Sequence, residues 1–162
     1  MIKDKFKELE IKIKYKFNNP YLLHQCMIHK SFDLSNNNEK LEFLGDRVLG
    51  LIISKKLIEI YPDEKEGIID KKFANLVNKK ICAQVSNNLN LIKYMSLGLS
   101  YKGQRKSDEK ILSDCIEALI GAIFLDSSLK NVEKFVLTMW NDFLKKSSLT
   151  IIDAKTKLQE YA

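Results

Sequence analysis

The sequence predicts an all-helical domain, and three observations support that fold class. Apolar residues recur at three- and four-residue spacings, as they do along one face of an α-helix. Only two prolines and six glycines interrupt the 162 residues. No segment shows the Val- and Thr-rich alternation that is typical of half-buried strands. We therefore expect helices joined by short polar segments, with a length and a 45% hydrophobic content that suit one compact domain.

The N-terminal part predicts two helices and a loop. Lys3–Tyr15 reads as an amphipathic helix. Asn19–Pro20 provides an N-cap followed by proline at the first helical position, and the short helix that begins there is expected to run to about His29. The polar stretch Ser31–Asn38, with three consecutive asparagines, predicts a loop.

The middle of the chain predicts two longer helices. The first covers Glu39–Ile60 and stops at Tyr61–Pro62, because the residue before a proline disfavours helical geometry. The second is expected as one continuous helix over Ile68–Asn87. Asn88–Tyr94 then predicts a short helix or turn.

The C-terminal part begins with a loop over Ser96–Ser107, which contains two glycines and three basic residues. Two further helices are expected over Asp108–Leu125 and Lys130–Lys145. From Ser147 onward the sequence predicts a linker, and a new segment begins near Asp153.

Composition narrows the class of protein. A formal net charge of +6 and a pI near 9.1 suit an anionic partner such as nucleic acid, although many lysine-rich proteins have no such partner. The cysteines Cys26, Cys82 and Cys115 lack metal-binding spacing, which predicts core residues in a reducing cytosol. We find no signal peptide and no apolar run of membrane-spanning length, so we expect a cytoplasmic protein.

Carboxylates lie on two helices that are otherwise apolar. Glu39, Glu42 and Asp46 share one face of the first, which carries apolar residues on nearly every other side. In the second, Asp114 and Glu117 are the only charged residues between positions 111 and 125, and they lie one turn apart. Burying an unpaired carboxylate costs several kcal/mol or more, so these acids need partners.

Two interpretations account for such acids. One is that they are structural and form salt bridges. The other is that both helices direct carboxylates into one cation site, next to which Gly121 would permit the close approach of a second helix. Oxygen ligands without His or Cys favour Mg²⁺ or Mn²⁺ over Zn²⁺. Such sites commonly activate water and neutralise charge on phosphates, which fits hydrolysis of a nucleic acid.

Two long motifs resemble those of the ribonuclease III family. Residues 38–46, Asn-Glu-Lys-Leu-Glu-Phe-Leu-Gly-Asp, resemble the family signature, and residues 112–122, Leu-Ser-Asp-Cys-Ile-Glu-Ala-Leu-Ile-Gly-Ala, resemble its second acidic motif. His29-Lys30-Ser31 and Glu66-Gly67 resemble shorter motifs that flank the signature. The order and separation of the motifs also match, and the resemblance covers essentially the whole chain.

The resemblance implies the all-α ribonuclease III endonuclease-domain fold, acting as a homodimer. Two symmetry-related sites would line one valley and each cut one strand of double-stranded RNA, leaving 5′-phosphate and 3′-hydroxyl ends with short 3′ overhangs. The implied cofactor is Mg²⁺, with Mn²⁺ as a substitute, and no small-molecule cofactor or membrane is implied. The implied role is the processing of rRNA and mRNA in the cytoplasm.

The resemblance also implies roles for individual residues. The metal ligands would be Glu42, Asp46, Asp114 and Glu117, with Asp46 and Glu117 as the catalytic pair. Glu39 and Glu66 match secondary acids that support metal or substrate, and Phe43 matches a residue buried in the dimer interface.

Other basic residues are weaker candidates for RNA contact. On the predicted helix Ile68–Asn87 they are Lys71, Lys72, Lys79 and Lys80, and in the following loop they are Lys102, Arg105 and Lys106. A solvated surface explains any one of them equally well. His24 and His29 have no catalytic partner at a suitable spacing, which favours a structural role.

Two segments depart from the family pattern. Arg47 stands where a small residue is usual, so it would either pair with a carboxylate or meet the partner subunit. The loop over Leu97–Lys110 lacks a double glycine that is common in the family.

The resemblance also predicts a division of the chain into domains. Residues 1–146 are expected to form the catalytic domain, and 147–162 a linker with the first residues of a double-stranded-RNA-binding domain, which Asp153–Tyr161 resembles.

Two other functions are alternatives to the double-stranded-RNA endonuclease. One is an inactive scaffold of the same fold that binds duplex RNA, and another is a short relative that trims ribosomal RNA precursors. The complete set of acids favours the enzyme.

Overall fold

The structure is a computed structural model that describes residues 2–101 and 105–148, without the side chains of 2, 3 and 105–107. Its helices are α1 (Ile2–Ile13), α2 (Pro20–Cys26), α3 (Glu39–Ile60), α4 (Glu66–Val77), α5 (Lys79–Asn88), the 3₁₀ helix η1 (Leu91–Tyr94), α6 (Arg105–Asp126) and α7 (Leu129–Met139). The chain is helical again over 141–148. The described residues form no strand beyond a single bridge between Ile28 and Ser96, so the all-helical prediction is confirmed.

Local capping explains where the first helices begin and end. The side chain of Asn19 accepts a hydrogen bond from the backbone N–H of Tyr21, and Pro20 occupies the first turn of α2. The helix ends at Cys26, earlier than the predicted end near His29. The backbone beyond it is diverted into the bridge with Ser96, whose N–H donates to the Met27 carbonyl at 2.8 Å.

The continuous helix predicted over 68–87 is wrong, because the chain breaks at Asn78. Its backbone leaves the helical region (ψ 163°), and its side chain accepts a hydrogen bond from the N–H of Ile81, capping a new helix. Two packed helices, α4 and α5, therefore replace one. The predicted helix over 130–145 is likewise interrupted after Met139, next to Trp140, whose buried indole N–H donates to the Leu76 carbonyl.

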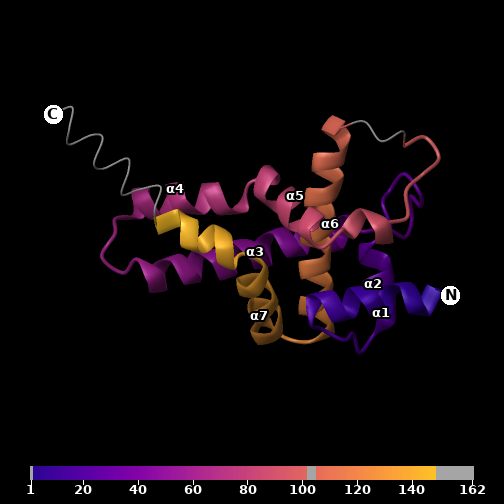
Figure 1. The fold of residues 1–162 in the computed structure, drawn as a ribbon, viewed down its shortest axis with the longest axis horizontal. Coiled ribbons are helices and arrows are strands. Elements are labelled where there is room, and N and C mark those ends of the chain that lie inside the picture. The colour runs from indigo at the N-terminus through magenta and orange to yellow at the C-terminus, as the bar shows by residue number, and fades with distance from the viewer. Residues whose placement is uncertain (1, 102–104, 149–162) are drawn as a thin grey trace.

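Helix α6 lies at the centre of the fold, and α3 crosses it (Figure 1). From Cys115 to Ile123, every residue of α6 except Glu117 is buried. Helices α5, α2 and α7 also pack against α6, while α4 runs beside the C-terminal half of α3. The core therefore forms around the stretch of α6 that carries Glu117, a charged side chain that needs a partner.

Two glycines lie where α3 and α6 cross. A methyl group at Gly45 would overlap the backbone carbonyl of Glu117, and one at Gly121 would overlap the backbone carbonyl of Leu41. The close approach expected at Gly121 is confirmed, and Gly45 is its counterpart on α3. Both positions require glycine because the two backbones touch there.

Three further predictions from the sequence concern the cysteines, membrane-spanning helices and the C-terminal segment. Cys26, Cys82 and Cys115 are free and buried, as predicted for core residues. No helix in the described part of the chain is long and apolar enough to cross a membrane. Asp153–Tyr161, the segment that resembles the start of an RNA-binding domain, lies outside the described residues.

Candidate metal centre

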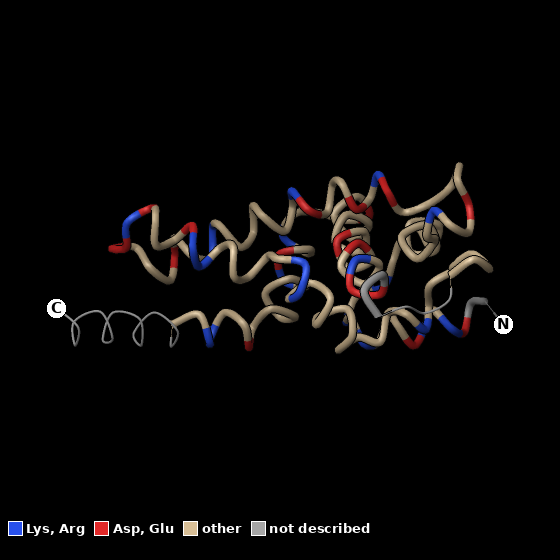
Figure 2. Tube along the Cα trace, turned by 90° about the horizontal axis from the view of Figure 1, so that it is seen from above, with Lys and Arg blue, Asp and Glu red and all other residues tan. Residues whose placement is uncertain are grey.

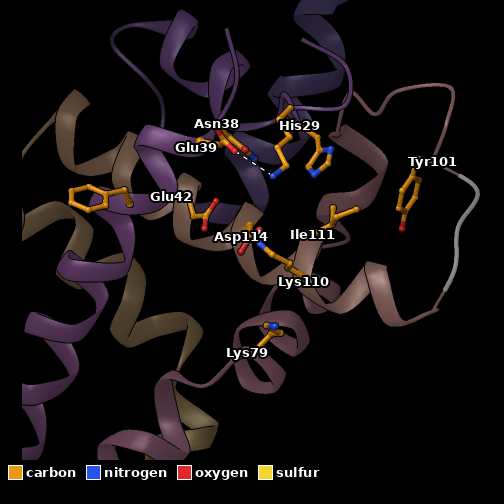
Figure 3. A pocket seen from close by; sticks show the side chains of 11 residues that line it. His29, Asn38, Glu39, Glu42, Lys79, Tyr101, Lys110, Ile111 and Asp114 are labelled. Atoms are coloured by element: carbon orange, nitrogen blue, oxygen red, sulfur yellow. Dashed lines mark hydrogen bonds and ion pairs between the residues drawn. The ribbon is translucent and has the colours of Figure 1, made fainter. Parts of the chain in front are cut away.

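The crossing of α3 and α6 brings three predicted ligands together. Glu42 follows Leu41, whose backbone carbonyl lies against Gly121 at the crossing. Asp114 and Glu117 lie on either side of the buried Cys115 in the sequence of α6. Each of the three half-buried acids places a carboxylate oxygen within 4.8 Å of the others. Figure 3 shows Glu42 and Asp114 facing each other from the two helices. This spacing suits one small cation held by oxygen ligands.

Asp46, the fourth predicted ligand, lies outside that group of three. Its carboxylate is exposed and forms an ion pair with Arg47 at 3.5 Å. Asp46 is still close enough for its charge to raise the pKa of Glu117. The structure therefore brings three predicted ligands together and leaves the fourth beside them, facing solvent.

The electrostatics of the cluster favour a bound cation. Burial, and then the charges of Asp46 and Asp114, raise the pKa of Glu117 to about 8. Burial, and then the charge of Asp114, raise the pKa of Glu42 to about 7. Both shifts show that ionised carboxylates are unfavourable here without a counter-charge, which a divalent ion would supply. The donor set and its repulsion therefore fit a hard divalent metal.

The cluster opens into a cavity of about 600 Å³. One side is acidic, with Glu39, Glu42 and Asp114, and the other carries Lys30, Lys79 and Lys110. Two ion pairs cross between the sides. Lys30 lies 3.5 Å from Glu39, and Lys110 lies 2.6 Å from Asp114 (Figure 3).

These lysines change the list of candidate RNA contacts. Lys79 was among the candidates, but sequence reasoning missed Lys30 and Lys110. The signal for Lys110 was its position four residues before Asp114, one helical turn away. Both missed residues are exposed and line the cavity.

Lys72 is corrected. Its side chain is only 3% exposed, its ammonium lies over the Tyr61 ring, and it donates a hydrogen bond to the Ser147 carbonyl. It therefore has a structural role and is withdrawn as an RNA contact. Lys71 is exposed, while Lys102 and the side chains of Arg105 and Lys106 lie outside the described residues.

The two secondary acids have different positions. Glu39 lines the cavity, whereas Glu66 is the first residue of α4, beyond the far end of α3, and does not line it. His29 also lines the cavity, and its ring nitrogen Nδ1 lies 2.7 Å from the Ser31 hydroxyl. That hydroxyl accepts from the Gly98 N–H, so His29 helps to join two loops.

Phe43 points away from the core. Its side chain is 62% exposed, and the guanidinium of Arg47 lies 3.6 Å from its ring centroid. Arg47 also donates to the Phe43 carbonyl at 2.9 Å. The residue that departs from the family pattern therefore links the exposed aromatic ring to Asp46.

Figure 2 shows the charges around the site from another side, with acidic residues gathered along α6. Basic residues of the same helix, Lys110 among them, lie close to these acids in the sequence of α6.

Comparison with known proteins assigns the family. A family model described as Ribonuclease-III-like matches residues 19–143. Ribonuclease 3 of Pelagibacter ubique is 55% identical over 156 residues, which are 96% of this chain and 70% of that protein. Ribonuclease 3 of Rhodopseudomonas palustris is 38% identical over 159 residues, which are 95% of this chain and 58% of that protein.

Solved structures agree with the sequence matches. The nuclease domain of ribonuclease III from Campylobacter jejuni, described as flexible in a region involved in dimer formation, superposes with a TM-score of 0.76 at 36% identity, covering 82% of this chain and 93% of that one. Dicer from Pichia stipitis, at 23% identity and a TM-score of 0.62, shares the fold. With its acids clustered at a helix crossing, this chain belongs to the ribonuclease III family of endoribonucleases.

Proposed function

We propose that this chain hydrolyses phosphodiester bonds in double-stranded RNA at the α3–α6 crossing, leaving 5′-phosphate and 3′-hydroxyl ends. One observation carries the proposal: three carboxylates from two helices meet within 4.8 Å. A scaffold that only bound RNA would gain nothing from acids whose burial, and then mutual repulsion, raise the pKa of Glu42 and Glu117. The intact cluster therefore favours the enzyme over an inactive scaffold.

In this proposal Glu42, Asp114 and Glu117 hold Mg²⁺, or Mn²⁺ in its place. The metal, when bound, supplies a water of lowered pKa and neutralises charge on the phosphoryl oxygens. Asp46 lies at the solvent side of the cluster, where its carboxylate would orient water. Once separated from Arg47, it would also join the three acids as the fourth metal ligand. Lys30 and Lys79 lie across the cavity, where they neutralise phosphates without reading bases.

The direct test is incubation of the chain with a long RNA duplex, in Mg²⁺ and in EDTA. Cleavage with Mg²⁺ that stops in EDTA, with 5′-phosphate ends on the products, would support the proposal. Binding of the duplex without cleavage at any Mg²⁺ or Mn²⁺ concentration would favour the scaffold. Single-stranded RNA of the same sequence serves as the control for duplex specificity.

The second part of the proposal is a homodimer formed through α3. Phe43, Leu51 and Ile58 are 62%, 56% and 59% exposed, and their spacing places them on one side of the helix. Large apolar side chains grouped on one helix face commonly mark an interface. A symmetric dimer would place two sites on one duplex, one for each strand.

Phe43→Ala tests the dimer. Truncating an aromatic residue that the partner buries costs about 3–5 kcal/mol, which shifts a dimer strongly towards monomer. Sedimentation velocity at micromolar concentration should show that shift, together with loss of double-strand cleavage. Ile11→Ala removes a similarly exposed apolar residue from α1 and should leave both unchanged. A parent chain that is monomeric and fully active would refute the dimer.

The remaining roles are also proposals. Residues 1–146 would form the catalytic domain, with 147–162 leading into an RNA-binding domain. We also propose a place in the processing of rRNA and mRNA in the cytoplasm, which rests on the resemblance of the two acidic motifs to those of the ribonuclease III family.

A further inference from the structure

Lys110 forms the shortest ion pair among the described residues. Its Nζ lies 2.6 Å from the Asp114 Oδ2 on the next turn of α6. The lysine side chain is 59% exposed, whereas the Asp114 side chain is only 16% exposed. A mobile, solvated cation is therefore held against an anchored carboxylate that belongs to the candidate metal centre.

The charge of Lys110 acts on the whole cluster. It opposes the upward pKa shifts that burial and neighbouring acids impose on Glu42 and Glu117. Lys30, the other paired lysine in the cavity, contacts Glu39, which lies outside the group of three acids. Lys110 is therefore the lysine that contacts a member of the group directly.

An ammonium and a divalent ion cannot both occupy this position at low cost. A cation held by Glu42, Asp114 and Glu117 would lie within a few ångströms of the Lys110 ammonium, where like charges repel strongly. The Lys110 side chain is long and half exposed, so it reaches solvent by simple rotation about its own bonds. Moving the lysine therefore disturbs the fold far less than moving any of the acids.

We propose that Lys110 is the internal counterion of the metal-free centre, and that it leaves Asp114 when a divalent ion binds. This inference rests on the proposed metal site. Lys110 acts through Asp114 as a positioning residue: it stabilises the acids without metal, and it weakens metal binding because it must first be displaced.

The test measures Mn²⁺ binding to the full chain without RNA, by the electron paramagnetic resonance signal of free Mn²⁺ at fixed pH and ionic strength. Lys110→Gln should bind Mn²⁺ roughly two- to fivefold more tightly than the parent, the scale expected for one ion pair. The metal-free melting temperature should fall, while the melting temperature at saturating Mn²⁺ should stay near that of the parent.

Two variants make the result specific. Lys79→Gln removes the same charge from the same cavity, but Lys79 forms no ion pair with any described residue, so its effect on Mn²⁺ affinity should be clearly smaller. Lys110→Arg keeps the charge and should bind Mn²⁺ much as the parent does, so that a gain seen only in Lys110→Gln is due to the lost charge. Lys110→Met, which also removes the charge, serves in place of Lys110→Gln if that variant fails to fold.

The outcomes separate the two proposals. If the parent binds no Mn²⁺, both the metal site and the counterion fail. If the parent binds Mn²⁺ but Lys110→Gln matches Lys79→Gln, only the counterion fails, because the gain is then a general charge effect. Weaker Mn²⁺ binding by Lys110→Gln would also overturn it, since the lysine would then support the bound metal.

Discussion

The two sides of the cavity are built in different ways. On the acidic side, Glu42 and Asp114 belong to the cluster completed by Glu117, whose members come from two helices with touching backbones and are all half buried. Glu39 also lines this side but is exposed. The lysines facing them come from the loop after α2, from the first residue of α5 and from the solvent side of α6, and all are exposed. Acids that must meet at one point are thus fixed by backbone packing.

The difference fits what the proposed function requires of each side. A hard metal ion tolerates small errors in ligand position poorly, so its ligands need a rigid frame. Phosphates on a duplex are spread over a long backbone, and a lysine on a flexible stem can follow them. We therefore expect substitutions of the three clustered acids to abolish function, and substitutions on the basic side to reduce it by degrees.

The largest effect is expected from Glu117→Gln. A neutral amide is a poor ligand for a hard cation, so duplex cleavage should fall by more than about 100-fold, beyond the usual cost of a lost supporting residue. Dimerisation and duplex binding should persist, because the amide has nearly the same size. Gel-based cleavage and a binding assay in Ca²⁺ would measure the two separately. Comparable cleavage by variant and parent would remove Glu117 from the metal centre.

Gly45→Ala tests the frame without touching an acid. The added methyl group meets the Glu117 carbonyl, so the two helices must separate. Overpacking of this kind typically costs about 1–3 kcal/mol and occasionally more, or roughly 2–12 °C in melting temperature for a chain of this size. Gly67→Ala is the matched control, because nothing lies within 4 Å of the added methyl there. Equal melting temperatures for the two variants would contradict backbone contact at the crossing.

The pH dependence of stability tests the burial of the acids and the repulsion among them. The pKa values of Glu42 and Glu117 are raised from 4.5 to about 7 and about 8 in the metal-free fold. Between roughly pH 4.5 and 8 the folded chain therefore binds more protons than the unfolded chain, and these groups make stability fall as pH rises.

In EDTA, the melting temperature of the parent should therefore decrease from pH 6 to pH 8.5. Glu117→Gln should show a flatter profile, and Mg²⁺ should raise the melting temperature most at the alkaline end. Differential scanning fluorimetry in buffers of matched ionic strength would record both profiles. A parent profile that rises over this range would mean that the acids are not crowded.

The smallest effect is expected from Lys79→Gln. Loss of one phosphate contact should weaken duplex binding modestly and reduce the salt slope of log K by about 1, without changing sequence preference. Fluorescence anisotropy with a labelled duplex at several salt concentrations would measure it, in Ca²⁺ to prevent cleavage. Lys130→Gln, an exposed lysine on α7, is the control with the same charge change. Equal salt slopes for the two variants would remove Lys79 from the RNA-binding surface.

Much of the acidic side was predictable from the sequence. The bounds of α3 follow from its periodic apolar residues and from Pro62, and the pairing of Asp114 with Glu117 follows from one helical turn. Gly121 indicated a close crossing, but its counterpart Gly45 did not stand out, because a helical glycine shows its purpose only when the opposing backbone is known. The motif order identified the family before any geometry was available.

Among the three lysines that line the cavity, the sequence pattern singled out only Lys79, for a physical reason. Lysines follow no hydrophobic periodicity, and the partner of a lysine, exposed or buried, can lie far away in the sequence. The ammonium of Lys72 reaches the Ser147 carbonyl, 75 residues further on, and no local pattern reveals that contact. The break at Asn78 is a local competition, in which an asparagine side chain caps a new helix where periodicity favoured continuing the old one. Glu66 was expected near the other acids, but it is the first residue of α4 and does not line the cavity, and the path of α4 could not be read from the sequence.

The glycine contact between α3 and α6 also limits how this sequence can evolve. Each missing side chain faces a main-chain carbonyl rather than another side chain, so no second substitution can make room for a larger residue. Gly45 and Gly121 cannot drift together as a compensating pair, as core residues of complementary volume can. In a population under selection for activity, two residues that touch neither metal nor RNA would be retained as strictly as Asp114 and Glu117. A saturation mutagenesis screen read by activity alone would classify them as catalytic, and only a parallel measurement of folded protein would separate the frame from the chemistry it holds.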